Sequence, residues 1–343
     1  MAKWDFTFGI EIECYLPEGG SAATAAQAIE ARGVACAAEH YNHQLRDHWK
    51  IVTDGSLGDY ARGIEVVSPI LRGVESLDMV RRVMGALDDY GCTVSVRCGL
   101  HVHVGAGTDA DLAFFRGLFK LYAHFEPVID RFMPPSRRQS ANMYCRSMTN
   151  VALSDVDRAA SLDALLNLTT RQAQVQRYHK LNLAAYRVHR TVEFRQHSGT
   201  LDAAKAANWI ALCLAMVDAA KAGRTITGTI AARQMNTARA GTKTHAVGEL
   251  ILRPEGATAA EAMAATGLGP RINLRHYARA CGLAVTTQRT GNETRYFAQA
   301  AAASTTAPAT LDGMFDLLGC EETEREFFRA RTANLSGGVQ WAA

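Results

Sequence analysis

Charged side chains alternate with aliphatic ones in four separate segments of this 343-residue chain, and this pattern constrains the fold most. Successive side chains of a β-strand point to opposite faces, so residues two apart share a face. The four segments lie at residues 9–13, 63–68, 100–105 and 191–195. If they are neighbours in one sheet, one face packs on helices. The other face then gathers seven polar side chains, which are Glu11, Glu13, Glu65, His101, His103, Glu193 and Arg195.

The remaining hydrophobic patterning predicts an α+β fold. Strands are expected at 6–15, 48–52, 63–68, 93–96, 100–105 and 191–196. Helices are expected at 22–32, 74–90, 109–132, 162–166 and 203–220. Asp109 and Asp111 suit the acidic start of one helix, and Asp202 suits the N-cap of another. Because the order is not a regular βαβ alternation, it favours the α+β class.

The length suggests two or three domains, and composition divides the chain. We expect a first domain at 1–222, a polar linker at 223–243, a compact unit at 244–298, an Ala/Thr/Pro-rich linker at 299–310, and helices at 311–343 that pack back on the first domain. In the compact unit, helices at 247–252, 259–266 and 271–281 precede strands at 283–288 and 294–297. Thr258 suits the N-cap of the second helix. This order resembles a winged helix-turn-helix.

The charged sheet face needs a partner, because like charges opposed on a sheet repel each other. A divalent cation removes this repulsion, and carboxylates with some imidazole suit Mg²⁺ or Mn²⁺. Arg195, two residues from Glu193, is placed to bind two phosphate oxygens. One polar strand face by itself is usually only solvated, and a His-x-His strand with acidic partners also suits a metal-dependent hydrolase. Four such strands rich in Glu favour a phosphate-handling metal site.

The ordered motifs resemble those of the amidoligases, a family of the carboxylate–amine ligase superfamily that includes glutamine synthetase and glutamate–cysteine ligase. The resemblance covers residues 6–220 in order and resumes at 311–331. It rests on Phe8-Gly9-Ile10-Glu11-Ile12-Glu13, Asp54-Gly55-Ser56-Leu57, Gly63-Ile64-Glu65-Val66-Val67-Ser68-Pro69, Cys98-Gly99-Leu100-His101-Val102-His103-Val104-Gly105, Tyr178-x-x-x-Asn182-Leu183 and Thr191-Val192-Glu193-Phe194-Arg195. Each motif is weak alone, whereas the ordered set is specific. The winged-helix-like unit lies outside the family pattern, as an insert.

The resemblance implies a glutamine-synthetase-like antiparallel sheet that cups ATP and two or more Mg²⁺ ions, with helices on its other face. It implies an ATP-dependent ligase that makes an amide through an acyl phosphate. The implied metal ligands are Glu11, Glu13, Glu65, His101 and Glu193. The implied nucleotide contacts are Arg195, Arg190, His101 and His103, with looser matches at Lys180 and Asn182. Arg138 with Asn142 is expected to hold the acyl or phosphoryl group, and Asp54 or Asp59 to deprotonate the amine.

Composition limits the other function classes. With 48% hydrophobic residues, 21% charged residues and a net charge of +3, global disorder and bulk electrostatic binding of nucleic acid by the whole chain are excluded. The eight cysteines form no Cys-x-x-Cys pair, which indicates reduced thiols in the cytoplasm. No signal-peptide pattern opens the chain, and its most apolar helical stretch, 210–217, is too short for a membrane span. We expect no membrane partner, and small-molecule or peptide substrates.

Two questions about partners stay open. The 244–298 region has six arginines against four glutamates, a weak excess for binding DNA. If it does bind DNA, Arg271, Arg275 and Arg279 are spaced along one face of its third helix. Such units also bind proteins. Self-association into a homo-oligomer is equally undecided by the sequence.

Overall fold

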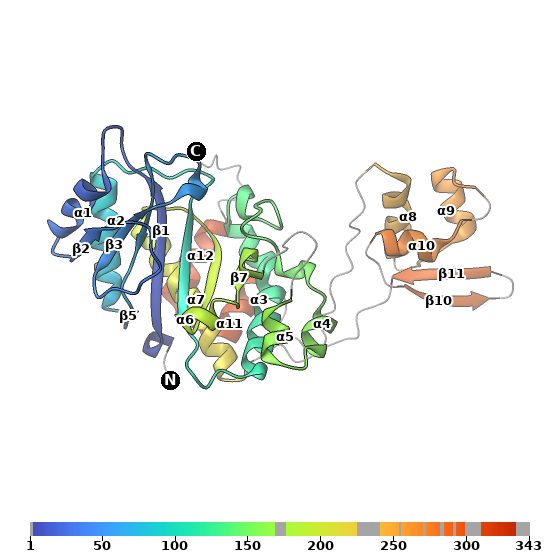
Figure 1. Ribbon diagram of the computed structural model, residues 1–343. Helices are drawn as coiled ribbons and strands as arrows, with labels where there is room; N and C mark the ends of the chain where they lie inside the picture. Colours follow the sequence, from blue (N-terminus) through green and yellow to red (C-terminus); the bar gives the residue numbers. More distant parts are fainter. Residues whose placement is uncertain are drawn as a thin grey trace. The chain divides into compact units, whose positions relative to one another are not determined.

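A computed structural model describes residues 3–168, 176–224, 241–253, 255–269, 272–281, 285–290, 293–298 and 310–333. The chain divides into two compact units (Figure 1). Unit 1 comprises Met1–Ile226 and Ala307–Ala343, and unit 2 comprises Thr227–Thr306. Most of the two linkers expected at 223–243 and 299–310 lies outside the described residues.

Unit 1 is built on a mixed sheet of eight strands in the order β2-β3-β4-β1-β6-β8-β7, with β5 paired to β1. The strands are β1 Thr7–Tyr15, β2 Cys36–Ala38, β3 Trp49–Thr53, β4 Gly63–Val67, β5 Leu71–Arg72, β6 Gly99–Gly105, β7 Leu181–Asn182 and β8 Thr191–Ser198. The expectation of a wholly antiparallel sheet is wrong, because β2 and β3 run parallel. The loop between them, residues 39–48, returns the chain to the end of the sheet at which β2 began, as a parallel pair requires.

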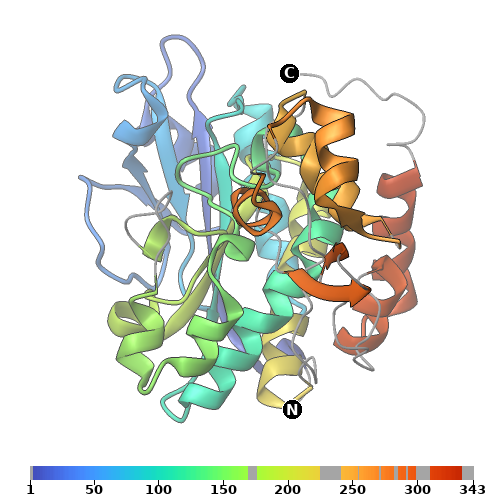
Figure 2. The same ribbon diagram turned by 90° about the vertical axis from the view of Figure 1, so that its right-hand side faces the viewer.

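The described helices of unit 1 are α1 Ala22–Glu30, α2 Ser76–Asp89, α3 Leu112–Phe132, α4 Leu153–Arg158, α5 Leu162–Leu166, α6 Tyr186–His189, α7 Ala203–Lys221, α11 Leu311–Leu318 and α12 Glu322–Ala333. The long helices α2, α3 and α7 cover one face of the sheet. Single 3-10 turns occur at Lys3–Asp5, Gly55–Leu57, Pro135–Arg137, Met148–Asn150 and Gln176–Tyr178. Figure 1 looks onto the sheet with the long helices behind it, and Figure 2 shows the strands and the red helices α11 and α12 on opposite sides of unit 1.

The long helices begin where side-chain oxygens can cap them. Asp111 accepts a hydrogen bond from Phe114 N at the start of α3, and Asp202 accepts from Ala204 N and Lys205 N at the start of α7. The cap expected at Asp202 is therefore confirmed. Helix α7 is long and apolar enough to cross a membrane, but 67% of its apolar window is buried inside the structure, as in a core helix.

The C-terminal helices pack on the helical layer of unit 1. Helix α11 contacts α7, and α12 contacts α3 and α7. The rings of Phe132 in α3 and Phe328 in α12 have centroids 4.8 Å apart. Apolar residues of α11, including Met314 and Phe315, are buried. A segment that follows unit 2 in the sequence thus completes the core of unit 1.

The strand expected at 93–96 does not form. Thr93 makes only an isolated bridge with Tyr15, and the chain then turns, with Cys98 N donating to Ser95 O. The sequence also gave no sign of the short strands β2, β5 and β7, which have two or three residues each. Such short segments carry too few alternations to stand out from a loop.

Unit 2 contains α8 Lys243–Leu252, β9 Ala257–Thr258, α9 Ala259–Thr266, α10 Leu274–Ala280, β10 Val285–Thr290 and β11 Glu293–Ala298. Its strands form an antiparallel sheet in the order β10-β11-β9. Thr258 caps α9 and accepts a hydrogen bond from Glu261 N, as expected. Buried Val247, Ile251 and Leu274 belong to a separate hydrophobic cluster in this unit. Arg271 and the side chain of Arg279 lie outside the described residues.

Candidate functional site

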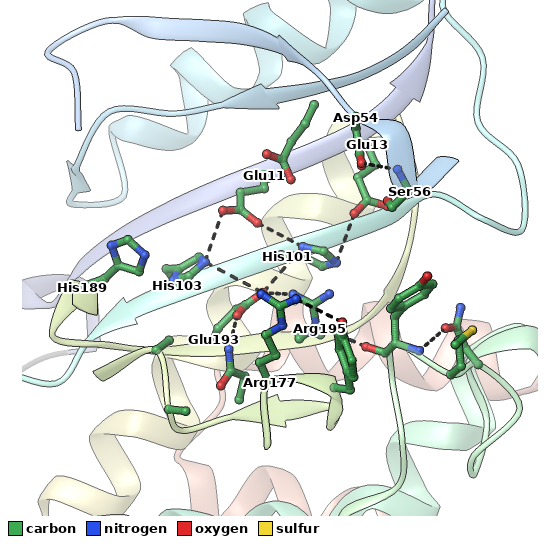
Figure 3. A pocket seen from close by; sticks show the side chains of 18 of the residues that line it. Glu11, Glu13, Asp54, Ser56, His101, His103, Arg177, His189, Glu193 and Arg195 are labelled. Atoms are coloured by element: carbon green, nitrogen blue, oxygen red, sulfur yellow. Dashed lines mark hydrogen bonds and ion pairs between the residues drawn. The ribbon is translucent and has the colours of Figure 1, made fainter. Parts of the chain in front are cut away.

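Four adjacent strands, β4, β1, β6 and β8, bring the predicted charged face together. Their registers place Glu11 opposite His101, Glu13 opposite Glu65, and His103 opposite Glu193. The aliphatic residues between them face the helices and are buried, as Ile10 and Ile12 illustrate. Figure 3 shows the labelled acids and histidines pointing toward one another above the sheet. The seven polar side chains expected on one face therefore all line a single pocket.

His101 lies at the centre of this cluster. Its Nδ1 is 3.1 Å from Glu11 Oε2 and 3.7 Å from Glu193 Oε1, and its Nε2 is 3.6 Å from Glu13 Oε1. Glu13 also accepts a hydrogen bond from Gly99 N at 2.6 Å. His103 lies two residues further along β6, on the same face. Its Nε2 is 3.5 Å from Glu11 Oε1, and its Nδ1 is 2.9 Å from Thr191 Oγ1. Each histidine is thus held between carboxylates of neighbouring strands.

Three groups of side chains place their ligand atoms within 4.8 Å of one another. The groups are Glu11 with Glu65 and His101, Glu11 with His103 and Glu193, and Glu13 with Asp54 and Glu65. Glu11 and Glu65 each belong to two groups. Carboxylates shared in this way can bridge neighbouring cations, which is the arrangement of sites that bind more than one metal ion.

The ionisation of Glu11 and Glu65 reflects this crowding. Burial raises the pKa of Glu65 well above its usual value, and the charges of Glu11 and Glu13 raise it further. Burial also acts to raise the pKa of Glu11, but His103 and His101 outweigh it and hold this pKa well below its usual value. The protein's own cations thus compensate Glu11 but not Glu65. A bound cation would supply the missing positive charge.

Arg195 and Asn182 flank Glu193. Arg195 Nη1 donates to Glu193 Oε1, its Nε donates to Tyr144 O at 3.3 Å, and Asn182 Nδ2 donates to Glu193 Oε2 at 2.6 Å. Burial acts to raise the pKa of Glu193, yet Arg195 and His103 outweigh it and lower this pKa. Asn182 Oδ1 is buried and has no hydrogen-bond partner among the described residues. Such an acceptor beside a carboxylate suits contact with a bound cation or a donor.

These residues form the floor of an open pocket of about 1290 Å³. Sites for one small ligand usually measure about 300–1,000 Å³, so this pocket has room for more than one substrate. Tyr41 and His43, from the loop after β2, contribute one part of the wall. The segment 136–144 and helix α6 contribute others. Asp54 and Asn142, both expected near the substrates, also line the pocket.

Lys180, expected at the nucleotide, is not part of the pocket. It is fully buried, and its Nζ donates to Glu126 Oε1 at 2.8 Å and to Asp130 Oδ1 at 2.6 Å. Both carboxylates belong to α3, so the side chain faces the helical layer. Lys180 precedes the two-residue strand β7 and lies in no predicted strand, so no periodicity indicated which way its side chain would face. The nucleotide contact is replaced by a buried ion-pair network.

Arg138, Arg190 and Asp59 also lie outside the pocket lining. Arg138 Nε donates to Met133 O at 2.8 Å. Arg190 ends α6 with a φ of 57°, and its guanidinium lies 5.0 Å from the centre of the Tyr186 ring. Asp59 Oδ2 accepts from Arg62 Nε at 3.0 Å. Asp54 is therefore the better placed of the two expected amine-deprotonating residues.

The sequence patterns did not mark the pocket residues that come from loops, single 3-10 turns and the short helix α6. They include Tyr41, His43, Arg97, Arg137, Tyr144, Arg177, Arg187 and His189. Arg137, and not the expected Arg138, lines the pocket, and it is buried with Nη2 donating to Cys98 O. Loops and single turns are too irregular or too short to show a strand or helix period, so no local pattern marked these residues. Asp54 and Asn142 were anticipated from the resemblance.

Comparison with known proteins agrees with the motif order. No curated protein sequence matches the chain significantly. A family model described as "Putative amidoligase enzyme" matches residues 5–217, which include all the strands and acidic residues of the site. The family points to an enzyme that forms amide bonds. Because the match spans more than half of the sequence, the chain belongs to this amidoligase family.

Proposed function

We propose that this protein is an ATP-dependent carboxylate–amine ligase of the superfamily that includes glutamine synthetase and glutamate–cysteine ligase. One observation carries the proposal. Carboxylates and histidines from four adjacent strands converge on one face, with an arginine at its edge. Metal-dependent hydrolases can also use shared carboxylates, but hydrolysis of one substrate by water would not need an arginine placed for phosphate together with room for two substrates. An ATP-dependent ligase would use both.

The donor set fits Mg²⁺ or Mn²⁺, because it is rich in carboxylate oxygens. The raised pKa of Glu65 and the unpaired Oδ1 of Asn182 both support a cation at this place. The residues that would hold it are Glu11, Glu13, Glu65, His101 and Glu193. When bound, the ions would neutralise charge on the phosphates of ATP.

In the proposed reaction, a substrate carboxylate oxygen attacks the γ-phosphorus of ATP, and the bond to ADP breaks. The product is an acyl phosphate. Arg195, held by Glu193 and by Tyr144 O, would bind oxygens of the transferring phosphoryl group. An amine then attacks the acyl carbon, the carbon–oxygen bond to phosphate breaks, and an amide forms. The amine loses one proton, which Asp54, a residue of the pocket lining, would accept.

A product screen tests this proposal. The purified protein is incubated with ATP, Mg²⁺ and pooled carboxylates and amines, and new amides are sought by mass spectrometry. We expect phosphate release that requires both substrate pools and a product lighter than its parents by one water. Hydrolysis of added amides or esters without ATP would contradict the ligase and favour the metal-dependent hydrolase.

We also propose that unit 2 is a winged helix-turn-helix insert that contacts double-stranded DNA. Its element order, α8-β9-α9-α10-β10-β11, supports this proposal. Arg275 and His276 are exposed on α10, and Arg275 Nη2 donates to Thr287 Oγ1 of β10 at 3.3 Å. Fluorescence anisotropy with a 20-base-pair duplex is the test. If Arg275 contacts a phosphate, Arg275→Ala should weaken binding equally for duplexes of different sequence. No binding of the unchanged protein at low salt would contradict the proposal.

A further inference from the structure

Exposed hydrophobic side chains gather at the mouth of the pocket. Nine large hydrophobic side chains of the described residues are exposed, and five of these line this one pocket. The five are Tyr41, Val96, Met143, Tyr144 and Val188. Val96 and Val188 are 69% and 76% exposed. Single exposed hydrophobic residues are ordinary on a protein surface, whereas a group around one concavity marks a binding surface.

Arginines accompany these hydrophobic side chains. Arg97 follows Val96, Arg187 precedes Val188, and Arg177 precedes Tyr178, and all six residues line the pocket. The acidic lining residues are Glu11, Glu13, Asp54, Glu65 and Glu193, which form the metal-binding groups of the floor. Figure 3 shows Arg177 on the opposite side of this cluster from Asp54. The mouth thus carries guanidinium groups among its hydrophobic side chains, whereas the floor combines the carboxylates with Arg195 and two histidines.

We propose that the mouth of the pocket binds the carboxylate substrate as an acidic peptide with hydrophobic side chains. The reacting carboxylate would reach the floor while the rest of the peptide covers the mouth; this inference rests on the proposed function. Arginines pair well with carboxylates, and the hydrophobic side chains between them match hydrophobic residues of a peptide. A free amino acid would leave Val96, Met143 and Val188 uncovered.

A nucleic acid strand fits this mouth less well. Single strands are bound largely by stacking of bases on aromatic rings. Tyr41 and Tyr144 offer rings, but the more exposed Val96 and Val188 do not. The peptide is thus the occupant that uses both the hydrophobic and the cationic parts of the mouth.

Peptide binding without nucleotide tests the inference. Fluorescence anisotropy compares a fluorescein-labelled Leu-Asp-Phe-Glu-Leu-Glu peptide with Ser-Asp-Ser-Glu-Ser-Glu, Leu-Lys-Phe-Lys-Leu-Lys and hexathymidylate probes. We expect the first peptide to bind at least about tenfold more tightly than the other three. Equal binding of the serine peptide would overturn the role of the hydrophobic mouth, and tighter binding of hexathymidylate would overturn the peptide in favour of nucleic acid.

Substitutions locate the binding surface. Val96→Asp and Val188→Asp should each weaken peptide binding about tenfold or more, by placing a carboxylate against an acidic ligand. Ile70→Asp is the matched control, because Ile70 is exposed on unit 1 but does not line the pocket. Arg97→Gln should weaken binding, whereas Arg81→Gln, at an exposed pair with Asp78, should not. Identical binding by the pocket variants and the controls would refute the inference.

Measuring the binding of ATP to the protein in the presence of Mg²⁺, alongside peptide binding, separates this inference from the proposed function. Peptide binding without ATP binding would support the mouth and contradict the ligase. ATP binding without any peptide preference would contradict the mouth and leave the ligase standing. Because the variants carry changes at exposed positions, their melting temperatures should match that of the unchanged protein.

Discussion

The buried Lys180 network gives the sharpest stability prediction. Lys180 Nζ contacts Glu126 and Asp130 inside unit 1, and all three side chains are shielded from solvent, with 0%, 2% and 15% exposure. Lys180→Met keeps much of the length and hydrophobic volume but removes the charge. Two carboxylates of α3 would then share a buried space without their cation. We expect a large loss of stability, because an uncompensated buried charge is costly.

The magnitude follows from the contacts that remain. Removing one partner of a buried pair typically costs about 3–5 kcal/mol. Glu126 keeps a hydrogen bond from Met148 N at 2.8 Å, and Asp130 keeps one from Gln196 Nε2 at 2.6 Å. These contacts offset part of the loss, so we expect about 3 kcal/mol for Lys180→Met. The double variant Lys180→Met with Glu126→Gln also neutralises one carboxylate, so it should recover part of the lost stability.

The pair also sets a pH dependence. Burial acts to lower the pKa of Lys180, but Glu126 and Asp130 outweigh it and raise this pKa above its usual 10.5. When a group has a higher pKa in the folded state than in the unfolded state, it stabilises the fold. This contribution is complete at pH values below the unfolded-state pKa. This contribution is then lost as the pH rises through the raised pKa. As Lys180 loses its proton, the stability difference between the protein and Lys180→Met should therefore shrink in strongly alkaline solution.

Urea unfolding followed by circular dichroism measures these changes. Arg158→Met is the matched control, because its ion pair with Asp155 is largely exposed and should contribute less than about 1 kcal/mol. Limited proteolysis of the folded variant reports on residues 133–148, which the network joins to α3 through Met148 and Gln139. A Lys180→Met protein within about 1 kcal/mol of the unchanged one would refute the reasoning.

Three further predictions concern the site and the insert. ATP binding measured by calorimetry should need Mg²⁺ or Mn²⁺, and equal affinity in EDTA would contradict a metal site. Glu193→Gln should weaken metal binding, and added Mg²⁺ should restore part of its activity. Arg195→Lys should lose about 100-fold in turnover with little change in ATP affinity, and added Mg²⁺ should not restore it. Near-normal phosphate release by both variants would contradict the ligase assignment. Replacing residues 244–298 by a short Gly/Ser bridge should leave a soluble, monodisperse protein, since unit 2 has its own hydrophobic cluster.

Local periodicity fixed the parts of the site that lie on strands. Strands β1, β4, β6 and β8 begin and end within two residues of their predicted bounds. The predicted face carries Glu11, Glu65, His101 and Glu193 together with its other polar residues. The bounds of α5 and α9 match their predictions, at Leu162–Leu166 and Ala259–Thr266. Alternation at a period of two is local, so the sequence states which side chains share a face.

Tertiary structure decided which strands are neighbours and what the loops bring to them. The register of β1 against β6 puts Glu11 beside His101, and nothing in either strand alone specifies this pairing. Arg137 rather than Arg138 reaches the pocket, because the segment around it is held by contacts distant in sequence, such as the bond from Arg137 to Cys98 O. Lys180 turns to α3 for the same reason. Periodicity assigns a side chain to a face, whereas long-range packing determines what that face meets.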